Sequence, residues 1–166
     1  MDAVFTDPLV ERIAAFLREI GLEVRSGAVG EGTALPGITI DRGILVVDEA
    51  RMLYPGDLLH EAGHLAVAPP ARRTAFRHDV GNDPAEEMMA IAWSYAAALY
   101  LKIDPAIVFH ADGYRGGGPS IVENFSAGHY FGVPMLDYVG MAVDIDRARR
   151  EGLMPYPHMR RWLREG

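Results

Sequence analysis

Residues 58–67 read Leu-Leu-His-Glu-Ala-Gly-His-Leu-Ala-Val, an apolar stretch that encloses the pattern H-E-x-x-H. Because residues four positions apart share one face of a helix, His60 and His64 can direct their imidazole rings at one point. Zn²⁺ suits this pair, since imidazole nitrogen is among its preferred ligands. Glu61 lies about 100° around the helix from His60, where it can take a proton from a water molecule on the metal. The sequence therefore predicts an active-site helix that carries two zinc ligands and a general base.

The apolar setting of the motif decides between this interpretation and a simpler one. Two structural histidines on a surface helix, with Glu61 in solvent, would have polar neighbours at the other helical positions. Here the residues on both sides are apolar, and Ala62 and Gly63 are small enough to let another segment approach closely. We therefore expect this helix to be buried against a second element.

A catalytic zinc site has three protein ligands and one open position, so one further ligand is needed. In the extended motif H-E-x-x-H-x-x-G-x-x-H, the third ligand is a histidine six positions after the second. This chain has Val67 where the motif needs glycine and Pro70 where it needs histidine. The remaining common solution is a glutamate on a following helix.

Residues 83–90, Asp-Pro-Ala-Glu-Glu-Met-Met-Ala, offer two such glutamates at the start of a predicted helix. An Asp83 cap places Glu86 at the third helical position, where a capping box would occupy its carboxylate. Glu87 then has no local partner in an otherwise apolar helix, so we expect Glu87 to be the third zinc ligand. Glu86 is the alternative metal ligand, and more distant candidates are His78, Asp79 and Asp83.

Helical and strand periodicity around the motif indicates an α+β fold, mostly helical with a small β-sheet. Asp7 and Pro8 predict a helix start, and apolar residues at helical spacing continue to Ile20, with a stop at Gly21. A hairpin is expected around residues 41–43, with the glycine in the left-handed conformation. The expected helices cover residues 9–20, 57–67 and 85–101, the expected strands 22–26, 38–40 and 44–47, and shorter helical candidates 105–110, 120–130, 134–143 and 157–163.

With these residues in this order, the chain resembles the glutamate-zincin (gluzincin) metallopeptidases, and among them the minimal cytoplasmic ImmA/IrrE type. The shared order is a helix, a small sheet, the His60-Glu61-x-x-His64 helix and an acid-bearing helix. The acid helix of that family typically reads Glu-Ala-Asn-x-Phe-Ala, and residues 87–92 keep its glutamate and its final alanine. The similarity covers about residues 38–101. It implies a zincin-like domain that holds Zn²⁺ and acts on a peptide or protein substrate.

Composition narrows the remaining classes of protein. A chain of 166 residues without cysteine has room for one core and has no disulfides or thiolate metal sites. A formal net charge of −7 disfavours nucleic-acid binding, which requires a basic surface. No apolar run approaches the length of a membrane span, and no secretory signal is evident at the N-terminus. We expect one cytoplasmic domain over residues 1–166, without nucleic-acid or membrane partners.

The C-terminal part supplies candidates for a group that stabilises the developing oxyanion or contacts substrate. Side chains with suitable chemistry are His110, Tyr114, Arg115, His129 and Tyr130. Residues 113–119 contain four glycines, so we expect a mobile loop without regular structure at the rim of the site. The alternatives are an ordinary surface loop and, for His129, a hydrogen-bonded structural residue.

Together these features predict a zinc-dependent metallopeptidase, in which His60, His64 and Glu87 hold the metal and Glu61 is the general base. Two other classes of function remain open at this point. One is a zincin-fold regulatory or interaction protein that holds zinc and cleaves nothing. The other is a zinc hydrolase that acts on a non-peptide amide.

Overall fold

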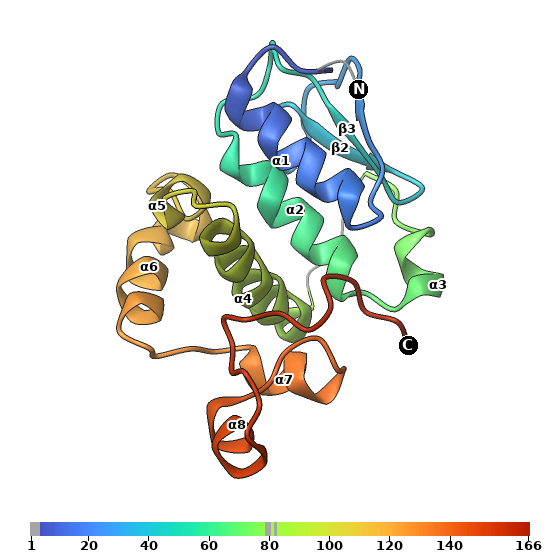
Figure 1. The fold of residues 1–166 in the computed structure, drawn as a ribbon. Helices are drawn as coiled ribbons and strands as arrows, with labels where there is room; N and C mark the ends of the chain where they lie inside the picture. The colour runs from blue at the N-terminus through green and yellow to red at the C-terminus, as the bar shows by residue number, and fades with distance from the viewer. Residues whose placement is uncertain (1–3, 79–80, 82) are drawn as a thin grey trace.

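The computed structural model describes residues 4–78, 81 and 83–166, and it has the predicted α+β architecture (Figure 1). Most of the elements are helices, and the strands form one small mixed sheet. The strands are β1 (Val24–Ser26), β2 (Ile38–Asp41) and β3 (Ile44–Val47). The helices are α1 (Pro8–Glu19), α2 (Gly56–Val67), α3 (Pro70–Arg73), α4 (Pro84–Tyr100), α5 (Pro105–Val108), the 3₁₀ turn η1 (Tyr114–Gly116), α6 (Gly118–Ser126), α7 (Val133–Tyr138) and α8 (Ile145–Glu151).

The sheet has the strand order β1-β3-β2, so β3 lies in the middle. It runs parallel to β1, where Val24 is opposite Leu45, and antiparallel to β2, where Ile40 is opposite Leu45. The predicted hairpin is confirmed, and Gly43 in its turn has a φ of 80°. Alternate residues of β2 and β3 are buried, which gives the sheet one apolar face.

Helix α1 covers the core between the sheet and α2. Its start is the predicted one, because the Asp7 side chain accepts hydrogen bonds from the backbone N–H groups of Leu9 and Val10. Apolar residues at helical spacing, including Ile13 and Leu17, are fully buried. Figure 1 shows α1 lying alongside α2, with β2 and β3 behind them.

Helices α2 and α4 pack closely, and this contact positions the candidate site. A Cβ on Gly63 of α2 would lie 3.0 Å from the Ala90 carbonyl oxygen and 3.0 Å from Ser94 Oγ on α4. Glycine therefore lets the two helix backbones approach, as the small residues of the motif predicted. Every residue of α2 from Gly56 to Val67 is buried except His60, which is half-buried.

The C-terminal part differs from the prediction in three places. Residues 157–163 are not helical, because the N–H of Arg160 donates to the Met141 carbonyl and Trp162 packs edge-on against Phe16 and Trp93. Helix α8 was not expected, although Asp144 caps its start. Helices α6 and α7 end at Ser126 and Tyr138, earlier than predicted, and a glycine with positive φ follows each end.

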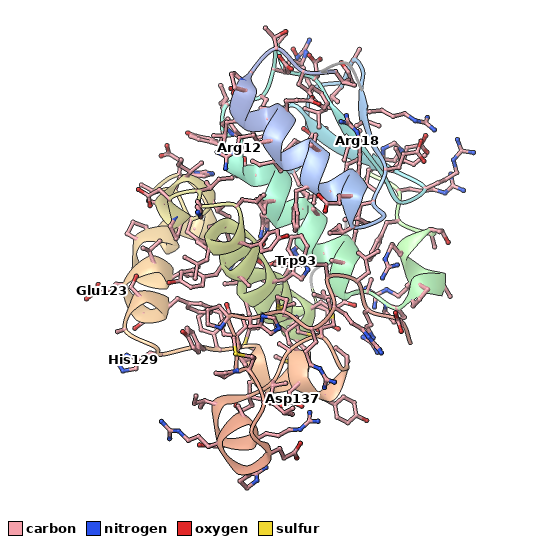
Figure 2. All side chains as sticks on the ribbon, in the orientation of Figure 1. Arg12, Arg18, Trp93, Glu123, His129 and Asp137 are labelled. Carbon is pink, nitrogen blue, oxygen red and sulfur yellow. The ribbon has the colours of Figure 1, made fainter. Side chains whose placement is uncertain are left out.

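The segment 156–164 runs back across α4 towards the end of α2 (Figure 1). The indole N–H of Trp93 donates to the Trp162 carbonyl, and Figure 2 places Trp93 in the interior of the molecule. The N–H of Arg164 donates to the Ala66 carbonyl at the end of α2. These contacts tie both helices of the candidate site to a distant part of the chain.

Within the described ranges, no helix combines the length and the apolar character needed to cross a lipid bilayer.

Candidate metal centre

Three metal-ligating side chains meet where α2 crosses the first turn of α4. One ligand atom each of His60, His64 and Glu87 lies within 4.8 Å of the other two. His64 Nε2 is 2.7 Å from Glu87 Oε2, and His60 Nε2 is 3.5 Å from Glu87 Oε1. His64 is only 5% exposed. Both imidazoles thus point at one carboxylate.

The close contact at Gly63 explains why Glu87 reaches the two histidines. Ala90, which lies against Gly63, follows Glu87 by three residues, so both are on the same face of α4. Glu86 faces away, and its Oε2 is 2.5 Å from Arg72 Nη2. The structure therefore brings Glu87, the expected third ligand, to the histidines and pairs Glu86 with a cation on α3.

The more distant candidates stay outside this group. The Asp83 side chain caps α4 by accepting from the Ala85 N–H. His78 is exposed and its backbone N–H donates to the Ile40 carbonyl. Asp79 lies outside the described residues.

The protonation states at the site suit a cation. Burial and the neighbouring His64 lower the pKa of His60 to about 4, so its ring is neutral at pH 7. Burial raises the pKa of Glu87, but the hydrogen bond from His64 and the charges of both histidines outweigh it and keep the pKa below its usual value. The neutral imidazole of His60 and the Glu87 carboxylate are donors in the deprotonated form that Zn²⁺ binds, and His64 offers a second imidazole.

The two possible tautomers of His60 differ in what a bound cation would change. Its Nδ1 is buried without a hydrogen-bond partner among the described residues. If Nε2 carries the ring proton, Nδ1 is left as a buried acceptor; if Nδ1 carries it, the Nε2 lone pair faces the Glu87 carboxylate. A cation between Nε2 and the carboxylate would remove the repulsion of the second arrangement, while the N–H of Nδ1 would still have no hydrogen-bond partner among the described residues.

Glu61 and Tyr114 lie next to the three ligand residues. Glu61 is on α2 and only 8% exposed. The ring of Tyr114 packs edge-on against His60, with 4.9 Å between centroids, and also contacts Phe109. Its hydroxyl is buried and has no hydrogen-bond partner among the described residues. Burial, followed by the negative charges of Glu87, Asp57 and Glu61, raises the pKa of this hydroxyl well above its usual value, so it stays protonated.

The glycine-rich segment is more ordered than the sequence predicted. Instead of an irregular loop, it contains the turn η1 and the start of α6 at Gly118. The Tyr114 ring anchors it against His60 and Phe109. Tyr114 and Arg115 have φ values of 56° and 54°, a conformation that residues with side chains rarely adopt. The segment therefore has regular structure where the glycines predicted an irregular loop, and the Tyr114 ring packs it against the rest of the protein.

A second histidine–carboxylate contact lies one helical turn before His60, and the sequence analysis did not include its acid. His110 Nε2 is 2.7 Å from Asp57 Oδ1, and Asp57 is 3% exposed. The ring of Tyr54 stacks on His110 at a centroid distance of 3.8 Å. Burial raises the pKa of Asp57, and the contact with His110 offsets only part of this. The signal for Asp57 was its position three residues before His60, on the same face of α2.

A cavity of about 500 Å³ opens beside Glu87, one of the three ligand residues. Glu87 and Tyr114 line it on one side and Arg115 contributes a cation. The remaining wall includes apolar side chains of Pro84, Ile91 and Ile121.

The other two C-terminal candidates are not brought to this site. Tyr130 packs against Phe125 and Tyr156, with ring centroids 5.3 and 4.7 Å away. His129 is exposed, and Figure 2 shows it at the outer edge of the molecule, after α6. The reason is the short connection after α6, which carries both residues past the end of the helix and away from α2.

Comparisons of this chain with protein-family models, with curated proteins and with solved structures find no match.

Proposed function

We propose that this protein is a zinc-dependent metallopeptidase that hydrolyses a peptide bond. The observation that carries the proposal is the convergence of His60, His64 and Glu87, the last of which lines a cavity. Structural zinc sites are closed by four protein ligands, whereas catalytic sites have three and keep one position open. The described residues supply three ligands here, next to an open cavity, and this arrangement corresponds to the catalytic kind.

Zn²⁺ held by these residues would polarise the scissile carbonyl and lower the pKa of water towards neutrality. Glu61 would accept the proton of the attacking water and return it to the leaving amine. The Tyr114 hydroxyl, which is buried and without a partner among the described residues, would donate a hydrogen bond to the developing oxyanion. His110, which is hydrogen-bonded to Asp57, would stabilise the fold next to this site.

The finer assignment of the fold belongs to the same proposal. The order α1, small sheet, α2 with the H-E-x-x-H motif and α4 with Glu87 resembles the ImmA/IrrE type of gluzincin. We therefore propose a zincin-like domain that works in the cytoplasm on a peptide or protein substrate and has no nucleic-acid partner. The net charge of −7 supports the last point.

The test is the Glu61→Gln variant, assayed with a peptide library by mass spectrometry. Glutamine keeps the volume of the side chain but cannot accept a proton, so hydrolysis should fall by about 10²–10⁴-fold. The zinc content, measured by elemental analysis, should remain that of the wild type. Glu123→Gln, on an exposed position of α6 (Figure 2), is the matched control and should leave both quantities unchanged.

Two results would contradict the proposal. If Glu61→Gln cleaves peptides as fast as the wild type, Glu61 is not the base. If the zinc-loaded wild type cleaves no peptide in the library, a zinc-binding regulatory protein or an amidase for non-peptide substrates becomes the better interpretation.

A further inference from the structure

The cavity beside Glu87 combines an apolar wall with charged side chains. Its apolar wall is formed by Pro84, Ile91 and Ile121, from the first turns of α4 and from α6. At about 500 Å³, it has the size of a small-molecule or side-chain pocket. Pockets of this kind owe their specificity to the few polar groups in an otherwise apolar lining.

The charged groups of this lining are Glu87 and Arg115. The Glu87 carboxylate is engaged with His60 and His64, and with a divalent cation in place its negative charge is more than neutralised. Arg115 has no ion pair or hydrogen bond from its guanidinium to any described residue. Most of the other arginines that border the core do have such partners, for example Arg73 and Arg147. A cation that has no partner in the described part of an acidic protein is available to a ligand.

The packing of Tyr114 sets the backbone position of Arg115. Tyr114 is wedged between His60 and Phe109, and both Tyr114 and Arg115 have left-handed backbone conformations. Non-glycine residues in this region cost free energy, and such conformations concentrate at ligand-binding sites. The anchored tyrosine thus fixes the backbone of Arg115 beside the cavity, and the exposed Arg115 side chain forms part of its lining.

From these observations we propose that the cavity binds a substrate residue with an apolar body and a carboxylate, and that Arg115 pairs with this carboxylate. The inference rests on the proposed peptidase function, because it places this residue next to the bond held at the metal centre. The carboxylate can come from the C-terminus of a peptide or from an acidic side chain. Both share the planar geometry that an arginine recognises with two parallel hydrogen bonds.

The experiment measures binding rather than cleavage, using the zinc-loaded Glu61→Gln protein and isothermal titration calorimetry. Three probes separate the sources: N-acetyl-Ala-Leu with a free C-terminus, the same dipeptide as its C-terminal amide, and N-acetyl-Ala-Glu amide. We expect at least one of the two carboxylate probes to bind more tightly than the Leu amide. Adding Arg115→Gln should weaken the carboxylate probes by about tenfold and leave the Leu amide within about twofold.

Arg150→Gln, on the exposed end of α8, is the matched control and should change none of the three dissociation constants. Arg115→Lys should retain part of the preference, since it keeps the charge and loses the planar fork. The free-acid dipeptide binding best indicates a C-terminal carboxylate, and the Glu probe binding best indicates an acidic side chain.

Three results would overturn the inference: equal affinity for acid and amide, equal weakening of both by Arg115→Gln, or no binding of either carboxylate probe up to millimolar concentration. Failure of the peptidase proposal looks different. In that case the wild type cleaves nothing, while the Arg115-dependent preference for carboxylates persists in the calorimeter.

Discussion

Helix α2 takes part in two histidine–carboxylate contacts, one through Asp57 and one, a turn later, through His60 and His64. They differ in how many imidazoles share one carboxylate. In one, His110 meets Asp57 at 2.7 Å. In the other, His60 and His64 both face Glu87, the closer at 2.7 Å. In the first contact one imidazole donates one N–H to one carboxylate, and His110 Nδ1 and Asp57 Oδ2 are buried without a hydrogen-bond partner among the described residues.

In the second contact, two imidazole nitrogens face one carboxylate. Each neutral imidazole has one N–H and one lone pair, and His60 Nδ1, like His110 Nδ1, is buried without a hydrogen-bond partner among the described residues. A divalent cation accepts lone pairs from both rings and from the carboxylate at once. The two groups therefore differ in the ratio of imidazoles to carboxylates rather than in the length of the short contact, and the higher ratio favours the proposed metal ion at the second group.

The largest expected effect is on zinc affinity. His60→Ala, His64→Ala and Glu87→Gln should each lose stoichiometric zinc, because each removes a ligand. The affinity should fall by more than about 100-fold, since loss of a group that merely supports a ligand already costs about 10–100-fold. Competition with a chromophoric chelator measures the dissociation constants.

Glu86→Gln is the matched control, because this side chain lies on the same helical turn and contacts Arg72 instead of the histidines. It should bind zinc as the wild type does. If Glu86→Gln loses zinc and Glu87→Gln retains it, the ligand assignment is reversed. If His110→Ala loses zinc as completely as His60→Ala, the distinction between the two groups disappears.

The next largest effect is on stability and concerns the Asp57–His110 pair. His110→Ala removes one partner and leaves a buried carboxylate, which should lower the free energy of unfolding by about 3 kcal/mol. Zinc affinity should change little. Urea denaturation of the metal-free protein measures the loss, and His129→Ala, at an exposed position, should shift it by less than about 0.5 kcal/mol. A loss as small for His110→Ala as for His129→Ala would mean that the pair contributes nothing.

The smallest effect is a pH dependence that comes from His60. Its pKa in the folded, metal-free protein is about 4, below the ordinary value of 6.5, so the folded state binds this proton more weakly than the unfolded state. Stability from this group is therefore complete above pH 6.5 and is lost as the pH falls towards 4. The slope is at most about 1.4 kcal/mol per pH unit.

This slope is measured by urea denaturation between pH 7 and pH 5 in the presence of a chelator. His60→Gln should have a flatter profile than the wild type, because glutamine does not titrate. Identical profiles for the two proteins would show that the ring of His60 is protonated as easily in the folded state as in the unfolded one.

Local signals in the sequence predicted much of this architecture. The Asp7 cap, the hairpin at Gly43 and the helix of the motif all depend on residues close together in the chain, and all are confirmed. The choice between Glu86 and Glu87 followed from helical geometry near Asp83, and the structure brings Glu87 to the histidines.

The parts that sequence reasoning missed depend on distant contacts. His110 and Asp57 are 53 positions apart, so nothing local connects them. The glycines of residues 113–119 predicted an irregular loop, whereas the segment contains the turn η1 and the start of α6, with the Tyr114 ring packed on His60. Residues 157–163 have an apolar pattern compatible with a helix, but their backbone bonds to Met141 instead.

The segment 156–164 has a consequence for the order of events during translation. The Tyr156 hydroxyl donates to the Ala92 carbonyl on α4, and the Arg164 N–H donates to the Ala66 carbonyl on α2. The ribosome adds about 5–20 residues per second, so the H-E-x-x-H helix emerges several seconds before its last packing partners. During that interval the histidines are available to any metal ion in the surroundings. In the proposed zinc protein, metal exchange would therefore have to remain possible until this segment has docked.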